Sequence, residues 1–396
     1  MSNKLTLINS LQGSVLDDRF SNISVANCDP ITGEQLGDGG CLSVVFKADD
    51  ELTGNQVAIK FFDPDFEDLD GTRKHGFLRE SELLTKLNNV DRCVHIVQEI
   101  KKFVLSITAA SGDTLSIELI YIVIEWLEFD ILEYFLNQHQ IEAITKLQIF
   151  RQCVLSVLSL HSARICHRDL KRDNFRIAQR LNENVVVSID LGSAVSIDAQ
   201  SNSNQLIYSN PRGASGFAPI ESLCGLSGIR VLGVYSDIYA LGAMLHDMFN
   251  VDYLFERLAQ DSVYKTILGV GLTKMIVARH RNIQEKAMLE EWHKLIKNVN
   301  HQIYPLSIQG AGNSIPNSIK LNMEFLFKEL TCLDYRKRVL DSNLLLKKID
   351  AMIKILSAAK LERVKNDQRL KLKQMKEIKA RELQYKLDQY LIKRVN

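Results

Sequence analysis

Apolar and polar residues alternate in short runs through the first third of the chain, from about residue 35 to residue 127. Three runs, 44–46, 57–59 and 119–124, are rich in β-branched residues, and turn signals such as Leu-Thr-Gly-Asn at 52–55 lie between them. Such runs are typical of β-strands with one face on a core. The segment 77–87 instead places its leucines on one side of a helix. The pattern therefore predicts a sheet interrupted by one helix.

After residue 127 the apolar residues recur at helical spacing. Leu147, Phe150 and Val154 share one helix face, and Ile238 and Leu241 share another. A β-rich first third followed by a helical remainder predicts an α+β protein with two lobes. The stretch from about 250 to 321 carries weaker signals, with one helix expected near 284–298.

The charge balance excludes a global attraction to nucleic acid or to an anionic membrane. The 396 residues include 49 basic and 48 acidic side chains, for a formal charge of +1. We therefore expect no specific nucleic-acid binding, and any basic surface must be local.

The spacing of the cysteines and the length of the longest apolar run indicate the cellular compartment of the protein. The seven cysteines are scattered without a C-x-x-C pair, which argues against a disulfide framework and against a zinc site. The start of the chain has no basic segment followed by an apolar core, and the run at 119–127 is too short to cross a bilayer. We expect reduced thiols in a cytoplasmic protein that is not integral to a membrane.

The last segment, 360–396, has 12 basic and 5 acidic residues, a local charge of +7, and neither proline nor glycine. It is expected to form one long basic helix. Its apolar positions keep no single heptad register, which argues against a long self-pairing coiled coil. We expect this tail to lie on the helical lobe or on a partner, with Lys371, Lys373, Lys376 and Lys379 facing an acidic surface or anionic lipid. A solvated helix without a partner is the alternative.

Candidate chemistry begins at the glycine-rich segment 36–44. Gly37, Gly39 and Gly40 lack side chains, so backbone N–H groups there can approach phosphate oxygens. Taken alone, the segment is explained equally well as a hairpin turn.

A cationic residue follows sixteen positions after Val44, where the strand 57–60 delivers Lys60. Its ammonium can hold phosphates once a carboxylate fixes it. Glu80 on the following helix is the candidate carboxylate and Glu82 is its competitor. We favour Glu80 because Leu84, four residues later, lies on the buried side.

The strongest signal is the segment 167–174, His-Arg-Asp-Leu-Lys-Arg-Asp-Asn, which fits H-R-D-L-x-x-x-N at every fixed position. With the preceding motifs in order, the chain resembles the eukaryotic-type protein kinases from about residue 36 to residue 338. The resemblance implies a bilobal fold with a β-rich N-lobe and a helical C-lobe. It also implies Mg²⁺-dependent transfer of the γ-phosphoryl group of ATP to Ser or Thr hydroxyls of a protein substrate.

The resemblance assigns roles to individual residues. Asp169 accepts or orients the substrate hydroxyl proton, Lys171 steadies the γ-phosphate, and Asn174 binds Mg²⁺. Asp190, in the Asp-Leu-Gly at 190–192 that ends an apolar strand, is a further expected Mg²⁺ ligand, because this cation prefers oxygen.

The implied nucleotide pocket lies at a hinge formed by 124–127, with Ile124 at the gatekeeper position. Asp130 is expected to bond the ribose, although a solvated carboxylate at a helix start explains it equally well. The residues expected to contact ATP are Leu36, Gly37, Gly39, Gly40, Val44, Ala58, Lys60, Ile124, Glu125, Leu127 and Asp130.

Three further residues have structural roles implied by the resemblance. Glu221, which follows the segment 213–220, is expected to pair with Arg338. Asp237, in the segment 236–242, is expected to hold the backbone of the catalytic loop.

Several positions depart from the family pattern. Leu42 replaces a loop glycine, Arg176 stands where an apolar residue usually underlies adenine, and Ala214 replaces a threonine, for which Ser215 is a candidate substitute. Arg168 resembles kinases whose activation loop is ordered by phosphorylation. The candidate acceptors in that loop are Ser201, Ser203, Tyr208, Ser209 and Ser215.

The expected organisation is an N-terminal extension at 1–30, an N-lobe at 31–127, a C-lobe at 128–356 and a basic tail at 357–396. The C-lobe includes the insertion at about 250–321, which is either a binding surface or plain helical elaboration. The principal alternative function is a pseudokinase scaffold that binds nucleotide and partner proteins without catalysis. A kinase of small molecules is a third possibility, which the pairing of Glu221 with Arg338 argues against.

Overall fold

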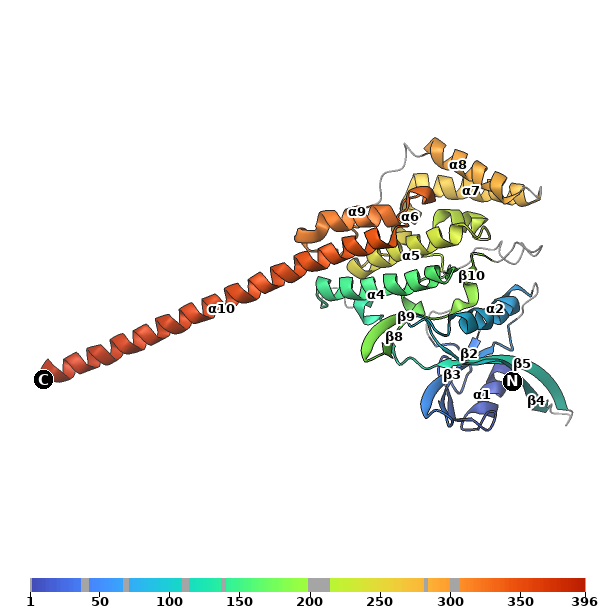
Figure 1. Ribbon diagram of the computed structural model, residues 1–396, viewed down its shortest axis with the longest axis horizontal. Coiled ribbons are helices and arrows are strands. Elements are labelled where there is room, and N and C mark those ends of the chain that lie inside the picture. The colour runs from blue at the N-terminus through green and yellow to red at the C-terminus, as the bar shows by residue number, and fades with distance from the viewer. Residues whose placement is uncertain are drawn as a thin grey trace.

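The structure is a computed structural model that describes residues 2–36, 43–66, 71–108, 114–136, 140–198, 214–280, 284–299 and 307–395. It has a small lobe built on a sheet (the N-lobe), a larger helical lobe (the C-lobe), and a single long helix that projects from the C-lobe (Figure 1). The expected α+β architecture with two lobes is confirmed.

The N-lobe is organised around a five-stranded antiparallel sheet in the order β1-β2-β3-β5-β4. Side chains alternate between the two faces of each strand. On β3, Ile59 and Phe61 join the apolar cluster on the outer face, whereas Ala58 and Lys60 face the C-lobe side. The strands are β1 (Phe20–Val25), β2 (Ser43–Asp50), β3 (Asn55–Phe62), β4 (Ile96–Thr108) and β5 (Thr114–Glu125).

The N-terminal segment completes the outer face of this sheet. Helix α1 (Asn3–Leu11) packs Leu7, Ile8 and Leu11 into the outer apolar cluster. Asp65 accepts hydrogen bonds from the first two N–H groups of this helix, at 2.8 and 3.0 Å, and so satisfies donors that have no partner inside the helix. Residues 2–25 therefore belong to the N-lobe and do not form the separate extension expected for 1–30, because β1 pairs with β2 in the sheet.

Helix α2 (Thr72–Leu87) lies between the sheet and the C-lobe (Figure 1). Leu83, Leu84 and Leu87 are buried in an apolar cluster that also contains Ile122 of the sheet and Leu160 of the C-lobe. The helix predicted at 77–87 thus forms, begins earlier than expected, and links the two lobes.

The C-lobe is built around α5 (Leu232–Phe249), a helix whose side chains are nearly all buried. Gly242 allows α5 to approach the end of α9 (Lys320–Leu330) closely, since an added Cβ would lie 2.5 Å from the Thr331 side chain. The remaining elements of this lobe, apart from the insertion, are β6 (Phe129–Asp130), α3 (Glu133–Leu136), α4 (Ala143–Ser162), β7 (Ile165–Cys166), β8 (Phe175–Arg180), β9 (Glu183–Ser188) and β10 (Val195–Ser196).

The insertion expected at about 250–321 is mainly helical in its described residues up to 299, whereas its described residues 307–316 form no helix. It contains α6 (Leu254–Gln260), α7 (Ser262–His280) and α8 (Glu285–Val299). Trp292 of α8 is fully buried, and α7 packs on the π-helical turn Ser222–Leu226. These helices extend the core of the C-lobe.

Within the described part of the chain, one helix, α4, is long and apolar enough by length and composition to cross a membrane. Its residues Leu147, Phe150 and Val154 are buried in the C-lobe core, where α4 packs against α5, β9 and the long C-terminal helix. These contacts are those of a core helix.

The C-terminal helix α10 (Ser342–Val395) runs without a break past the expected boundary at residue 356. Its first turns bury Leu345, Ile349 and Met352 against the C-lobe, but the side chains of residues 357–385 are exposed. Of the two placements expected for the tail, on the C-lobe or on a partner, the first is therefore wrong for residues 361–385. Lys371 and Lys373 point about 200° apart on the helix. The four lysines expected to face one surface, Lys371, Lys373, Lys376 and Lys379, therefore do not share one face.

We expect Ile8→Ala to lower the free energy of unfolding by about 2–5 kcal/mol, because the side chain is fully buried and its removal leaves a cavity. Ser10→Ala, on the exposed side of α1, is the matched control and should unfold like the wild type. Chemical denaturation measures both. Equal stability of Ile8→Ala and Ser10→Ala would show that α1 does not belong to the N-lobe core.

Candidate active site

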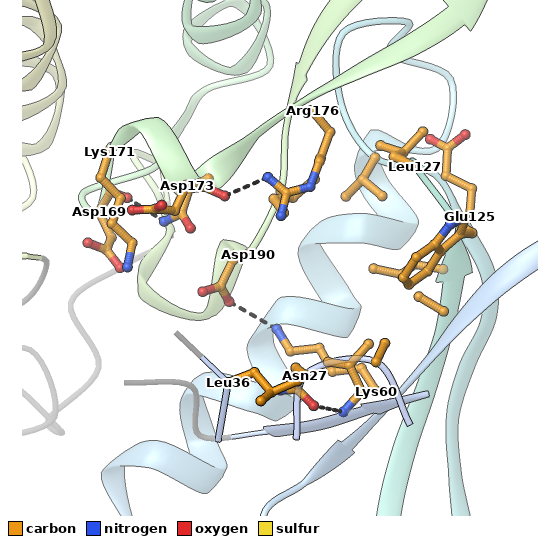
Figure 2. Close-up of a pocket in the computed structure, with 18 of the residues that line it drawn as sticks. Asn27, Leu36, Lys60, Glu125, Leu127, Asp169, Lys171, Asp173, Arg176 and Asp190 are labelled. Atoms are coloured by element: carbon orange, nitrogen blue, oxygen red, sulfur yellow. Dashed lines mark hydrogen bonds and ion pairs between the residues drawn. The ribbon is translucent and has the colours of Figure 1, made fainter. Parts of the chain in front are cut away.

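A cleft of about 430 Å³ lies between the two lobes, bounded by β2 and β3 on the N-lobe side and by the loop that follows β7 on the C-lobe side (Figure 2). A volume of this size accommodates a small-molecule ligand. The structure brings ten of the predicted site residues together in its lining: Leu36, Ala58, Lys60, Ile124, Glu125, Leu127, Asp169, Lys171, Asn174 and Asp190.

The expectation for Val44 was wrong. Val44 is fully buried on the outer face of the sheet, whereas Val45, opposite Lys60 on the neighbouring strand, lines the cleft. A shift of one residue moves a side chain to the other face of a strand. The alternation of β2 therefore decides which valine faces the ligand. Gly37, Gly39, Gly40 and Leu42 lie outside the described residues, as do Ser201, Ser203, Tyr208 and Ser209.

A buried lysine pairs with two carboxylates on the N-lobe side of the cleft. The Lys60 Nζ lies 2.9 Å from both carboxylate oxygens of Glu80 on α2 and 2.9 Å from Oδ1 of Asp190 after β9. Lys60 and Glu80 are buried, and Glu82, the competing candidate, is exposed. The structure therefore pairs Lys60 with Glu80 and ties both to the metal-ligand candidate.

Burial and charge act on these carboxylates in opposite directions. Burial raises the pKa of Glu80, although the Lys60 ammonium opposes that effect. The same ammonium holds the pKa of Asp190 below its usual range. Burial, together with the nearby charge of Asp190, raises the pKa of Asp169. Asp190 is thus kept ionised, as a metal ligand must be, and Asp169 is a stronger proton acceptor than an exposed aspartate.

Backbone hydrogen bonds fix the catalytic loop. Asn174 donates from Nδ2 to the Asp169 carbonyl at 2.7 Å, which fixes the orientation of its amide group. The Asp169 carboxylate accepts a hydrogen bond from the Ala214 N–H at 2.8 Å. The backbone of Ala214 thus contacts Asp169 where a threonine was expected to do so, and the Ser215 side chain is exposed.

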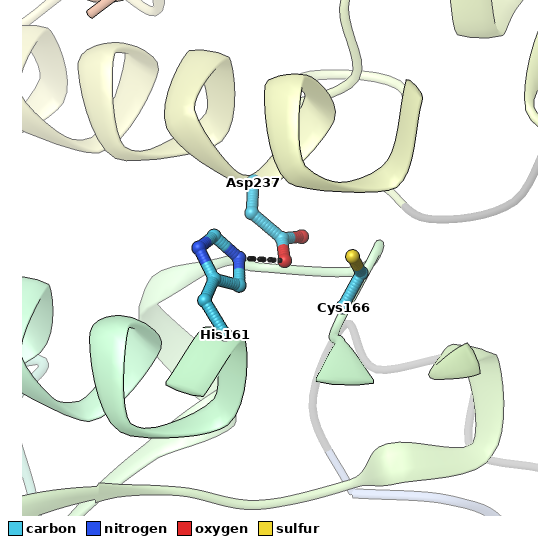
Figure 3. A group of neighbouring side chains, drawn as sticks. All are labelled: His161, Cys166 and Asp237. Atoms are coloured by element: carbon cyan, nitrogen blue, oxygen red, sulfur yellow. Dashed lines mark hydrogen bonds and ion pairs between the residues drawn. The ribbon is translucent and has the colours of Figure 1, made fainter. Parts of the chain in front are cut away.

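Asp237 on α5 holds the start of this loop, as predicted. Its carboxylate accepts hydrogen bonds from the N–H groups of His167 and Arg168, at 2.9 and 2.7 Å. His161 adds a third contact at 2.8 Å, and the Cys166 thiol lies beside them (Figure 3). Because these contacts occupy the Asp237 carboxylate, we assign the cluster a structural role, which is to hold the start of the catalytic loop on α5.

Two residues of the site adopt left-handed backbone angles that side chains other than glycine rarely take. Arg168 has φ 64° and Asp190 has φ 60°. Such conformations cost about 1–3 kcal/mol each and persist only when the surroundings impose them. Asp237 imposes the first and Lys60 helps to impose the second, which directs Asp190 into the cleft.

Comparison with known proteins agrees with this geometry. The family described as protein kinase domain matches residues 31–348. The chain belongs to the protein kinase family.

Among curated proteins the kinase resembles serine/threonine-protein kinase PLK4 of Drosophila persimilis, with 24% identity over 271 residues, which is 67% of this chain and 30% of that protein. It is also 24% identical over 235 residues to probable serine/threonine-protein kinase 2 of Plasmodium falciparum (isolate K1 / Thailand), covering 59% of this chain and 38% of that protein. The kinase thus spans about a third of the length of these relatives.

The hinge of the kinase is fixed from behind the cleft. Glu125 accepts a hydrogen bond from the His95 N–H at 2.8 Å and pairs with Arg180. Asp130 is not among the cleft-lining residues of the described chain, and it accepts a hydrogen bond from the Leu132 N–H at 2.9 Å beside α3. The structure therefore favours the helix-start interpretation of Asp130 over the expected ribose contact.

Sequence reasoning missed Asn27, which lines the cleft from the segment after β1. Its side chain accepts a hydrogen bond from the Val45 N–H at 2.8 Å and donates to the Ser43 carbonyl at 2.9 Å (Figure 2). It thereby fixes the start of β2 over the site. No pattern before residue 31 indicated this contact.

Arg176 brings a charged group into the cleft. Its Nη1 donates to the carbonyls of Asp173, at 3.0 Å, and Phe175, at 2.9 Å (Figure 2). Burial lowers its pKa, the direction in which desolvation acts on a cation. Arg176 therefore replaces an apolar floor with a partly desolvated guanidinium that points back at the catalytic loop.

Glu221 and Arg338 form the predicted ion pair at the base of the C-lobe. Arg338 donates to the two carboxylate oxygens at 2.5 and 3.1 Å, and both side chains have no exposed surface. Arg338 also donates to the carbonyls of Cys332 and Tyr235, at 2.8 and 3.0 Å. The pair therefore ties the segment before α5 to the segment after α9.

We predict that Arg338→Ala lowers the free energy of unfolding by about 3–5 kcal/mol, because it leaves Glu221 buried without its charge partner. The control is Arg336→Ala, which removes a half-exposed arginine paired with Asp334 and should cost about 0–1 kcal/mol. Thermal and denaturant unfolding measure the difference. Similar losses for the two variants would contradict the structural role of the buried pair.

We predict that Arg176→Leu tightens ATP binding by about three- to tenfold, because an apolar floor then meets the base without a guanidinium to displace. Isothermal titration calorimetry measures the affinity. Arg172→Leu, on the same loop but outside the cleft lining, should leave it unchanged. Weaker binding by Arg176→Leu would show instead that the guanidinium contacts the nucleotide directly.

Proposed function

We propose that this kinase is catalytically active and transfers the γ-phosphoryl group of ATP to Ser or Thr hydroxyls of a protein substrate in a Mg²⁺-dependent reaction. The observation that carries the proposal is the convergence of Lys60, Asp169, Lys171, Asn174 and Asp190 on one cleft. Family membership and the printed names of the relatives support the same activity. We also propose a cytoplasmic location, on the grounds that the cysteines form no C-x-x-C pair and that basic and acidic residues are nearly equal in number.

The donor set fits a hard divalent cation. Asp190 offers an ionised carboxylate and Asn174 an amide oxygen, both from the C-lobe side of the cleft. Mg²⁺ prefers such oxygen ligands. When bound with ATP, the metal would neutralise phosphate charge during transfer.

The chain's own residues supply the remaining chemistry. Lys60, fixed by Glu80, would hold the phosphates of ATP, and Lys171 would counter charge at the transferred group. Asp169, whose pKa is raised, would accept the proton of the substrate hydroxyl. The Ala214 N–H keeps that carboxylate in place. Catalysis would rest on positioning and charge.

A pseudokinase scaffold is the second candidate, and Arg176 is the observation that favours it. Its guanidinium fills space on the C-lobe side of the cleft and donates hydrogen bonds to two backbone carbonyls there. We prefer the active enzyme because Lys60, Asp169, Lys171, Asn174 and Asp190 all line the cleft.

We expect Asp169→Asn to lower turnover by about 10²–10⁴-fold while ATP affinity stays near wild type, since only the proton acceptor is lost. Transfer of radiolabel from γ-labelled ATP to a generic protein substrate measures turnover, and calorimetry measures affinity. Glu82→Gln, exposed on α2, is the control and should retain activity. A folded wild type that binds ATP without transferring phosphate would support the pseudokinase, and unchanged turnover in Asp169→Asn would exclude Asp169 as proton acceptor.

A further inference from the structure

The part of α10 beyond the C-lobe is a long helix whose side chains from 361 to 383 are all exposed. An ion pair between Lys360 and Glu142, at 2.6 Å, joins the start of this part to the C-lobe. Beyond it, Leu361, Leu372 and Leu383 are 56%, 59% and 63% exposed. Most helices in proteins are stabilised by packing one apolar face. This helix therefore has apolar surface that a second molecule could cover.

The exposed leucines recur every eleven residues, at 361, 372 and 383. Eleven residues make three turns of 3.67 residues, close to the period of a straight helix, so the three leucines run nearly along the helix axis. Val364 and Met375 follow three residues after the first two leucines and widen the line. We call these five residues the apolar stripe. It is about 33 Å long, from the rise of 1.5 Å per residue.

Charge is unevenly divided around this segment. At 100° per residue, the half of the helix centred on the apolar stripe carries five basic residues and one acidic residue between 361 and 383, a net charge of +4. The opposite half carries three basic and three acidic residues, a net charge of zero. The five basic residues beside the stripe are Lys365, Arg369, Lys371, Lys376 and Lys379.

We propose that the apolar stripe binds a helix of another protein that presents apolar residues flanked by glutamates or aspartates. Charges beside an apolar seam select the partner in paired helices, and opposite charges attract. A second copy of this chain would bring another net charge of +4 against the stripe. A lipid surface fits less well because Lys379 lies within the stripe itself, between Met375 and Leu383, where a membrane would bury it.

The probe is a synthetic helical peptide with leucines every eleven residues and glutamates beside them, and the control peptide carries lysines in place of the glutamates. Binding to the full chain is measured by fluorescence anisotropy. We expect the acidic peptide to bind and the basic one not to bind. Leu372→Ser combined with Leu383→Ser should weaken binding at least about tenfold.

The matched control is Leu370→Ser, because Leu370 is 56% exposed but lies about 180° from Leu361 on the helix. It should bind the acidic peptide like the wild type, and Lys379→Glu should bind it more weakly. Asp169→Asn should also bind normally, so the result is independent of catalysis.

Three results would overturn the proposal. They are equal binding of the acidic and basic peptides, loss of binding in Leu370→Ser equal to that in the stripe variant, and dimerisation of the chain alone through the stripe in sedimentation. Capture by phosphatidylserine vesicles that depends on Leu372 and Leu383 would assign the stripe to a membrane instead.

Discussion

The arrangement of the two lobes depends on a single buried ammonium group. Lys60 comes from the sheet, Glu80 from the helix between the lobes, and Asp190 from the C-lobe, and the lysine holds both carboxylates at 2.9 Å. A buried charge is costly unless it is paired. Separation of the lobes or rotation of α2 would leave at least one of these groups uncompensated. The electrostatic requirement thus fixes the geometry in which the cleft is complete.

A second constraint lies in the C-lobe. There Asp237 accepts hydrogen bonds from successive backbone N–H groups of the catalytic loop. Because α5 is buried along nearly its whole length, this carboxylate cannot shift without disturbing the C-lobe core. The strained backbone at Arg168 is held by the same contact. The position of Asp169, the candidate proton acceptor, is therefore set by a helix that is buried in the C-lobe core.

The motifs with fixed spacing could be predicted from the sequence, since Lys60, Asp169, Asn174 and Asp190 all line the cleft. Val44 could not be placed correctly, because choosing between neighbouring valines requires the register of β2 against β3. The N-terminal helix was missed because nine residues are too few to give a clear periodic signal, and its burial depends on a sheet formed later in the chain. The helical tail followed from composition, but its continuity with the helix that begins at Ser342 and the exposure of its side chains from 361 to 385 did not.

The straightness of α10 has a consequence for distance. A helix is a stiff spacer that gains about 1.5 Å per residue, so the segment from residue 361 to residue 395 reaches about 50 Å from the body. A molecule held near its far end would be kept away from the cleft, whereas one held near its base would lie close to the C-lobe. A flexible linker of the same length would let either molecule sample the active site. The position at which a molecule binds along this helix would therefore determine whether it can reach the active site.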